Sequence, residues 1–340
     1  MESNEPDFAL LGPDCVLDAI ESLGFVIDAR IFALNSYENR VYQIGLEDAP
    51  PLIAKFYRPK RWTQQQILEE HDFCLALAEH ELPVVAPMRL NQTGEDKPLH
   101  GVGSLFEHRH FRFALFPQRG GHPPELDNLD HLFQIGLQLG RIHSLGRHHQ
   151  FTHRLRLSIN GWGRQSQQFL LENNFIPASL TRAYESLSND LLQLCEQFSD
   201  TLQATRFFRI HGDCHPGNIL FRDGKATFVD FDDAVNGPAI QDIWMLLSGP
   251  RENRIIQLCE ILEAYNEFCD FDHKELVLIE LLRTLRIMHY AAWLAKRWSD
   301  PSFPVNFPWF NTERYWSEHI LELREQYAML QEEPLSLPAR

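Results

Sequence analysis

Residues 207–230 alternate short apolar runs with polar turns, and this pattern constrains the fold more than any other stretch of the chain. Each run has the length and composition of a β-strand. The three runs are Phe207–Ile210, Asn218–Phe221 and Ala226–Val229. Asp223-Gly224 favours positive φ and predicts a hairpin turn between the last two runs. Asp213 and Asp230, which follow the first and third runs, are therefore expected at adjoining strand ends facing one cleft.

The polar side chains of this stretch have the spacing of a phosphoryl-transfer centre. Asp213 and Asn218 are separated by four residues, the spacing that in kinase catalytic loops sets a base beside the acceptor hydroxyl and an oxygen ligand beside Mg²⁺. A phosphoryl group in transit carries spread negative charge, and the hard cations that stabilise it prefer oxygen ligands. We therefore expect Asp213 and Asp230 to be catalytic, with Asn218 and Asp230 as the Mg²⁺ ligands.

The same stretch is open to two other interpretations. His211, Asp213 and His215 at alternate positions could share a strand face in a transition-metal site of a hydrolase, but no other His/Asp cluster of similar density completes a binuclear site. The stretch could also be a polar turn after a buried strand. A polar turn does not explain why Asp213, Asn218 and Asp230 recur at kinase distances, so phosphoryl transfer is favoured.

The motif H-G-D-x-H-x-G-N at 211–218, with D-x-D at 230–232, resembles that of the aminoglycoside phosphotransferase and choline kinase superfamily. Over nearly the whole chain, the sequence is also similar to a group of bacterial stress response kinases, which phosphorylate Ser and Thr of proteins. The blocks that carry this similarity are Leu34–Tyr42, Lys55–Pro59, Ile67–His71, Asn236–Leu247 and Asn306–Trp309. The resemblance implies an α+β, protein-kinase-like fold of two lobes, with a small antiparallel sheet in the first and mostly helices in the second.

Lys55 closes an apolar strand, and the resemblance implies that it binds ATP phosphates and pairs with an acid on the next helix. That helix is predicted to begin at a Thr63 cap and to end near His80. Glu70 shares an inward face with apolar residues three, four and seven positions away, so it is the predicted partner and Glu69 the fallback. The alternative for Lys55 is a solvated strand edge.

The expected phosphate loop contains no G-x-G-x-x-G sequence, and Asn35–Asn39 stands between the first two predicted strands instead. Small polar residues can present backbone N–H groups and a hydroxyl to phosphate oxygens without glycine. Ser36 is the predicted phosphate contact, as the resemblance also implies. An ordinary strand-connecting turn is the alternative.

Two further departures from the protein-kinase pattern concern regulation and metal. Gly212 stands where an arginine would pair with a phosphorylated activation loop, so no switch of that kind is expected. Asp232-Asp233 replace the glycine of D-F-G. Asp232 could assist a second metal or cap a turn.

The N-terminal, nucleotide-binding lobe is predicted over 1–117 and the C-terminal, catalytic and acceptor-binding lobe over 118–340. The Pro- and Gly-rich segment Pro117–Pro124 would be the hinge, and backbone groups near Phe116 and Gln118 would hold the adenine edge. The first lobe is expected to contain a helix over 13–23 and strands over 29–34, 40–44, 52–56, near Met88, over 111–116 and through the alternation 108–113. The second is expected to contain helices over 128–145, 180–202, 254–268 and 274–298.

Several polar residues outside the motif are expected to have supporting roles. Asp242 is expected to offset the dipole of a helix that begins at 243, His143 to be a packing residue, and His211 to bond the backbone of its own loop. The last predicted helix carries a polar set that in the resembling family walls the acceptor site, although a solvated face with aromatic packing is favoured. That set is Arg283, Arg286, His289 and Tyr290.

Composition fits a soluble enzyme. A length of 340 residues with 44% hydrophobic content suits two lobes with a sizeable core, and a net charge of −16 argues against nucleic acid as a partner. An acidic cleft would favour a cationic acceptor unless the charge is spread over the surface. Residues 1–5 show no targeting signal, and no apolar run approaches the roughly 20 residues that span a bilayer. Six scattered cysteines favour reduced thiols in a cytoplasm.

The sequence thus predicts a monomeric, ATP-dependent Ser/Thr protein kinase of the stress response that uses Mg²⁺ and a protein acceptor, without membrane or nucleic-acid partners. A small-molecule kinase of the aminoglycoside or choline type is the main alternative, because the catalytic motifs handle the phosphate rather than the acceptor. A nucleotide-binding regulator without catalysis is the other, supported by the missing glycine loop.

Overall fold

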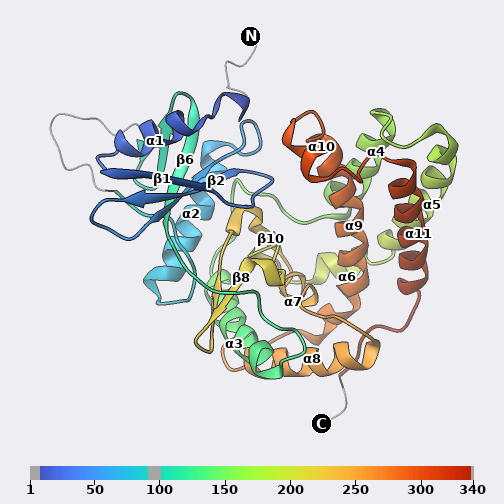
Figure 1. The fold of residues 1–340 in the computed structure, drawn as a ribbon. Helices are drawn as coiled ribbons and strands as arrows, with labels where there is room; N and C mark the ends of the chain where they lie inside the picture. The colour runs from blue at the N-terminus through green and yellow to red at the C-terminus, as the bar shows by residue number, and fades with distance from the viewer. Residues whose placement is uncertain (1–7, 91–100, 338–340) are drawn as a thin grey trace. The chain divides into compact units, whose positions relative to one another are not determined.

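The computed structural model describes residues 8–90 and 101–337, and the chain divides into two compact units (Figure 1). Unit 1 comprises 1–125, 151–154 and 215–234, and unit 2 comprises 126–150, 155–214 and 235–340. The lobe boundary at residue 117 stays a prediction. The acidic N-terminal residues 1–5 lie outside the described residues.

Unit 1 is built on a six-stranded antiparallel sheet with the order β1-β2-β3-β6-β5-β4. The strands are β1 (Ile27–Ala33), β2 (Arg40–Leu46), β3 (Leu52–Phe56), β4 (Gly101–Val102), β5 (Leu105–His108) and β6 (Phe111–Pro117). The strand predicted near Met88 is wrong, because Met88 lies outside every strand and donates only its backbone N–H to Leu115 O, at 2.7 Å. The strand predicted over 108–113 is interrupted, since Arg109 and His110 have φ of 47° and 71° and form the turn between β5 and β6.

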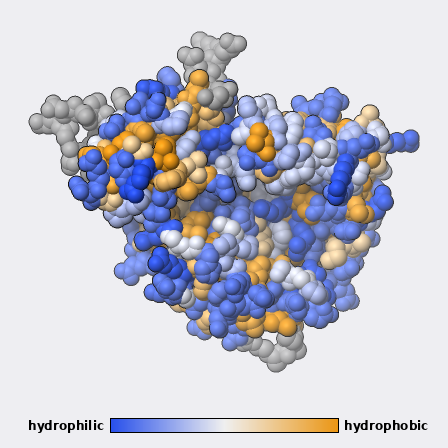
Figure 2. Space-filling view, in the orientation of Figure 1, coloured by the Kyte–Doolittle hydropathy of each residue, from blue (hydrophilic) through white to orange (hydrophobic). Residues whose placement is uncertain are grey.

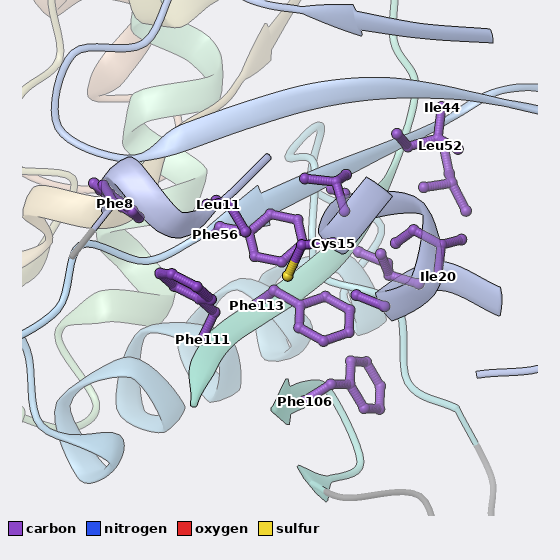
Figure 3. Packing of buried hydrophobic residues seen from close by; sticks show 14 of the residues in the cluster. Phe8, Leu11, Cys15, Ile20, Ile44, Leu52, Phe56, Phe106, Phe111 and Phe113 are labelled. Carbon is purple, nitrogen blue, oxygen red and sulfur yellow. The ribbon is translucent and has the colours of Figure 1, made fainter. Parts of the chain in front are cut away.

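Two helices pack on opposite faces of this sheet. Helix α1 (Pro13–Glu21), which begins with proline as predicted, packs its buried Cys15 and Ile20 against alternate strand residues such as Phe56 and Phe113 (Figure 3). The intervening residue Ala114 packs with Ile67 of α2 (Gln64–Glu79). Because successive strand residues point to opposite faces, Lys55 lies on the α2 face of β3.

Helix α2 confirms the prediction from its capping residues. The Thr63 hydroxyl accepts the Gln66 N–H at 3.3 Å while the Gln66 side chain accepts the Thr63 N–H at 2.9 Å. The predicted inward face of the helix is buried, including Ile67, Glu70 and Cys74.

The segment 215–234 completes unit 1 with a hairpin. Strands β8 (Ile219–Arg222) and β9 (Lys225–Phe228) pair in register around the predicted turn, in which Asp223 and Gly224 have φ of 51° and 73°. Backbone hydrogen bonds between Phe228 and the chain just after α2 attach the hairpin to that helix, through Pro83 O at 2.8 Å and Val85 N at 3.0 Å. A short 3₁₀ turn, η4 (Phe231–Asp233), follows.

Unit 2 is mostly helical, as predicted. Its helices are α3 (Leu129–Gly146), α4 (Gln165–Glu172), α5 (Ala178–Glu196), α6 (Ser199–Ala204), α7 (Ile240–Trp244), α8 (Arg251–Tyr265), α9 (Ile279–Lys296), α10 (Ser302–Asn306) and α11 (Glu313–Met329). The single helix predicted over 180–202 is divided into α5 and α6, and the one over 274–298 begins as the 3₁₀ segment His273–Leu278. Strands β7 (Phe208–Ile210) and β10 (Val235–Gly237) form a two-stranded antiparallel sheet.

The packing of α3 on α8 depends on two glycines. A Cβ atom on Gly136 or Gly140 would collide with the backbone carbonyl of Ile261 or Tyr265, so glycine is what allows this close approach. Helices α5 and α11 also lie side by side in unit 2 (Figure 1). Hydrophilic residues cover most of the face shown in Figure 2, with apolar residues in small groups. Of the described helices, none is long and apolar enough to cross a membrane.

Candidate functional site

Lys55 lies in the middle of the sheet of unit 1, where its register partners are Val41 on β2 and Ala114 on β6. It is 6% exposed, so it is not the solvated strand edge considered above. Its Nζ contacts Asp230 Oδ1 at 2.7 Å and Asp232 Oδ1 at 3.4 Å. Burial disfavours the charged ammonium, but the carboxylates of Asp230, Asp232 and Glu70 together outweigh burial and raise the pKa of Lys55. The structure therefore brings two predicted site residues, Lys55 and Asp230, together.

Glu70 is 1% exposed on the inward face of α2. Burial raises the pKa of this carboxyl, although the charges of Lys55 and Arg154 oppose the rise. Within the described residues Glu70 Oε2 has no hydrogen-bond partner. Glu70 thus interacts with Lys55 through charge, while the direct partner of the lysine is Asp230. The fallback Glu69 accepts the backbone N–H groups of 152, 153 and 154 at 2.6, 2.8 and 2.8 Å.

Asp230 begins the η4 turn in the left-handed conformation, with φ of 58°. Aspartate tolerates this region better than most residues, because its short side chain can bond nearby backbone. The next residue, Phe231, is buried and packs edge-to-face on Phe73 of α2, with ring centroids 6.0 Å apart. Phe231 therefore anchors the segment while the Asp230 side chain stays 50% exposed and accessible to a ligand.

Asn218 lies at the base of the β8–β9 hairpin, as the last residue of the 3₁₀ turn Pro216–Asn218. Its carbonyl accepts the N–H of Val229 at 3.0 Å, directly before Asp230. The predicted ligands Asn218 and Asp230 therefore come from the same end of one hairpin. A carboxylate, an amide oxygen and water suit Mg²⁺, which keeps several waters in protein sites. In the described ranges, no group of three or more His, Cys, Asp or Glu could hold a metal ion, and the roles of Asn218 and Asp230 toward Mg²⁺ stay predictions.

Asp213 lies in unit 2, directly after β7, following Gly212, whose φ is 83°. Its Oδ1 contacts Arg286 Nη1 of α9 at 2.5 Å. The sequence favoured a solvated face for Arg286 and did not predict this ion pair, since no local pattern links residues so far apart. The convergence of Asp213 with Asn218 and Asp230 stays a prediction.

Asp242 holds the Asp213 loop in place through hydrogen bonds. Its carboxylate, 0% exposed, accepts the backbone N–H groups of His211 and Gly212, each at 2.8 Å, and contacts His143 Nε2 at 3.0 Å. Asp242 lies in the first turn of α7, where its charge offsets the helix dipole as expected, although that helix begins at Ile240 rather than at 243. Its carboxylate also bonds the Asp213 loop, a role that the sequence pattern did not predict. His143 is the buried packing residue expected, and Tyr265 satisfies its other nitrogen at 3.0 Å. His211 accepts the Asp213 N–H at 3.3 Å, as expected.

The remaining predicted site residues lie around the sheet of unit 1. Ser36 is half-buried in the loop between β1 and β2. Phe116 lies on β6 opposite Ile53 of β3, and the exposed Gln118 donates its side-chain N–H to Gln43 Oε1 at 3.0 Å. Their roles toward phosphate and adenine stay predictions.

Comparison with known proteins identifies the family of the chain. A model described as the phosphotransferase enzyme family matches residues 30–277. The chain is 43% identical over 337 residues to stress response kinase A of Escherichia coli strain K12, with 99% of each chain covered. It matches the serine/threonine protein kinase RdoA of Salmonella typhimurium strain LT2 to the same extent. These matches confirm the resemblance predicted from the sequence blocks.

Solved structures confirm the kinase-like α+β fold. Amicoumacin kinase hAmiN aligns with a TM-score of 0.69 at 19% identity, covering 96% of this chain and 95% of that one. Choline kinase LicA from Streptococcus pneumoniae aligns with a TM-score of 0.62 at 14% identity, covering 93% of this chain and 98% of that one. At such identities the likeness concerns the fold alone.

Proposed function

Because the chain belongs to the phosphotransferase enzyme family, we propose that it is a stress response kinase that transfers the γ-phosphoryl group of MgATP to Ser or Thr hydroxyls of proteins. The observation that carries phosphoryl transfer is the contact of buried Lys55 with Asp230 at 2.7 Å, beside the hairpin base that presents Asn218. The protein acceptor is supported by the relative named as a serine/threonine protein kinase, which is 43% identical over 99% of this chain.

Each predicted residue then has one role. Asp213 orients the acceptor hydroxyl and accepts its proton, and Arg286 holds the Asp213 carboxylate. Asn218 and Asp230 would hold Mg²⁺, which neutralises the charge of the phosphates when it is bound. Lys55 binds phosphate oxygens, with Glu70 adding negative charge behind it.

The nucleotide has contacts of its own. Ser36 binds phosphate from the loop between β1 and β2, and the backbone near Phe116 and Gln118 bonds the adenine edge. The unit-1 residues that touch nucleotide all lie on or beside the β2-β3-β6 part of the sheet. We further propose that the enzyme acts as a monomer in the cytoplasm, where its six thiols stay reduced.

Identification of the phosphorylated product tests this proposal. The full chain is incubated with γ-labelled ATP and Mg²⁺, together with a generic basic protein, with a panel of aminoglycosides and choline, or alone. We expect label on Ser or Thr of protein, and none with Asp213→Ala. Label on the small alcohols with unlabelled protein would identify a small-molecule kinase. Tight MgATP binding without turnover on any acceptor would identify a nucleotide-binding regulator.

A further inference from the structure

Arg61 occupies an unusual position in the loop between β3 and α2 of unit 1. Its guanidinium is largely buried, with a side chain only 10% exposed, and it contacts three carboxylates at once. Nη1 lies 2.5 Å from Asp232 Oδ2 and 3.3 Å from Glu38 Oε2, and Nη2 lies 2.5 Å from Asp233 Oδ1. These carboxylates come from two segments far apart in the sequence, which this one side chain connects.

The first segment is the glycine-free turn 35–39. Glu38 Oε1 also contacts Arg58 Nε at 3.0 Å, and Asn39 Oδ1 accepts the Arg58 backbone N–H at 3.0 Å. The Asn39 amide donates to Asp232 Oδ2 at 3.2 Å. Side chains therefore fix the shape of this turn, which in a glycine-rich loop would depend on the backbone alone.

The second segment is the η4 turn that carries Asp230. Asp232 is 3% exposed and lies within 3.4 Å of Lys55 Nζ. Arg154 bonds the carbonyl of Asp232 and also that of Ala234, the latter at 2.8 Å. The residues that follow Asp230 are thus held, and they limit where its half-exposed carboxylate can lie.

Arginine has the geometry that this connection requires. Its planar guanidinium presents five N–H groups in fixed directions and can bond several carboxylates at once, whereas the ammonium of lysine is a single point charge. Residues that orient metal ligands without touching the metal commonly change metal affinity when they are replaced.

We propose that Arg61 is a positioning residue that joins the 35–39 turn to the Asp230 segment, so that Mg²⁺ and nucleotide phosphate are bound as one unit. The inference rests on the proposed function, because it assigns the turn to phosphate and Asp230 to metal. It predicts that Arg61 sets how strongly Mg²⁺ tightens nucleotide binding, rather than the rate of phosphoryl transfer itself.

Titration calorimetry of the full chain with a non-hydrolysable ATP analogue, with and without Mg²⁺, tests the proposal. The ratio of the two dissociation constants measures the contribution of Mg²⁺. In Arg61→Gln we expect this ratio to fall by roughly 10- to 100-fold. In assays, the Mg²⁺ concentration for half-maximal rate should rise, with kcat at saturating Mg²⁺ near that of the wild type. An unchanged ratio in a folded Arg61→Gln protein would overturn the proposal.

Matched variants separate positioning from general stability. Arg58→Gln disturbs the turn but not the Asp232 contacts, so both dissociation constants should rise together and the ratio should stay constant. Arg61→Lys should melt near the wild-type temperature yet keep a reduced ratio, and full recovery of the ratio by lysine would contradict the bridging role. If Arg61→Gln does not fold, Asp233→Asn can replace it, because the Asp233 side chain is 50% exposed. Asp233→Asn should lower the ratio of dissociation constants by less than Arg61→Gln does.

A surface control and the wild type complete the design. Arg89, 54% exposed, pairs with Asp72 and Glu79 of α2 at 3.7 and 3.6 Å, and Arg89→Gln should leave the ratio unchanged. Wild-type protein that binds no nucleotide would sink the proposed function itself. If Mg²⁺ tightens nucleotide binding equally in the wild type and in Arg61→Gln, only the proposed role of Arg61 is wrong.

Discussion

The two loops that carry the predicted catalytic carboxylates are held in place by different chemistry. In unit 1 the Asp230 segment is held by ion pairs, since Asp232 lies against Lys55 and Arg61. In unit 2 the Asp213 side chain also forms an ion pair, with Arg286, but the backbone of its loop is held by hydrogen bonds from two N–H groups to the carboxylate of Asp242. Charged side chains can re-pair when one partner changes, whereas backbone N–H groups buried with one acceptor cannot. The Asp213 loop should therefore be the less tolerant of substitution.

The largest effect is expected at the predicted base itself. Asp213→Ala should lower kcat by roughly 10³-fold, because the acceptor hydroxyl loses its proton acceptor, while MgATP affinity should change little. Phosphoryl transfer and analogue binding are measured on the same preparation. Asp190→Ala, at an exposed position of α5, is the control. Wild-type turnover in Asp213→Ala would remove Asp213 from the mechanism.

Asp242→Ala tests the backbone-held loop. Two buried N–H groups and His143 would lose their common acceptor, so the free energy of unfolding should fall by about 4 kcal/mol. Urea unfolding followed by circular dichroism measures the change. Asp242→Asn keeps one acceptor oxygen and should cost about half as much. A loss below about 1 kcal/mol for the alanine variant would mean that the loop does not depend on Asp242.

A second buried carboxylate of unit 2 should make stability depend on pH. Glu275 accepts the Ile240 N–H at 2.9 Å, and burial raises its pKa from 4.5 to about 7. Between these values the folded chain keeps a proton that the unfolded chain has released, so this contribution to stability is full below pH 4.5 and is lost as pH rises to about 7. The loss is on the order of 3 kcal/mol.

Glu275→Gln should remove that part of the pH dependence. Unfolding free energies of the variant and the wild type are compared at steps across the window. The difference between the two proteins should favour the wild type at low pH and diminish as pH rises. A constant difference across the window would show that Glu275 ionises normally.

The smallest effect is expected for the ion-paired segment. Asp232→Asn removes one negative charge, but Lys55 still pairs with Asp230, and Arg61 still pairs with Asp233 and Glu38. The free energy of unfolding should therefore fall by only about 2 kcal/mol. The same urea measurement applies. If Asp232→Asn destabilised the protein more than Asp242→Ala, the contrast between the two loops would be reversed.

Much of the fold could be predicted because its signals are local. The Thr63 cap fixed the start of α2, Asp223-Gly224 fixed the β8–β9 turn, and Pro13 began α1. The prediction of strands failed where a turn occurs within an alternating pattern. Residues 108–113 alternate in polarity like one strand, but residues 109 and 110 form a turn with two positive φ values. The break between α5 and α6 was also missed, because the helical periodicity of residues 180–202 is not interrupted there.

The sequence by itself determined the kind of site, because the motif at 211–218 and the carboxylate at 230 fix the residue types and spacing within short stretches of chain. Only the tertiary structure decided the partners. Lys55 bonds Asp230 across 175 positions and Arg61 bonds Asp232 across 171, while Asp242, in the first turn of α7, accepts two N–H groups of the Asp213 loop. A buried charge pairs with whichever opposite group the packing brings within reach, and that choice depends on the folded backbone rather than on sequence spacing.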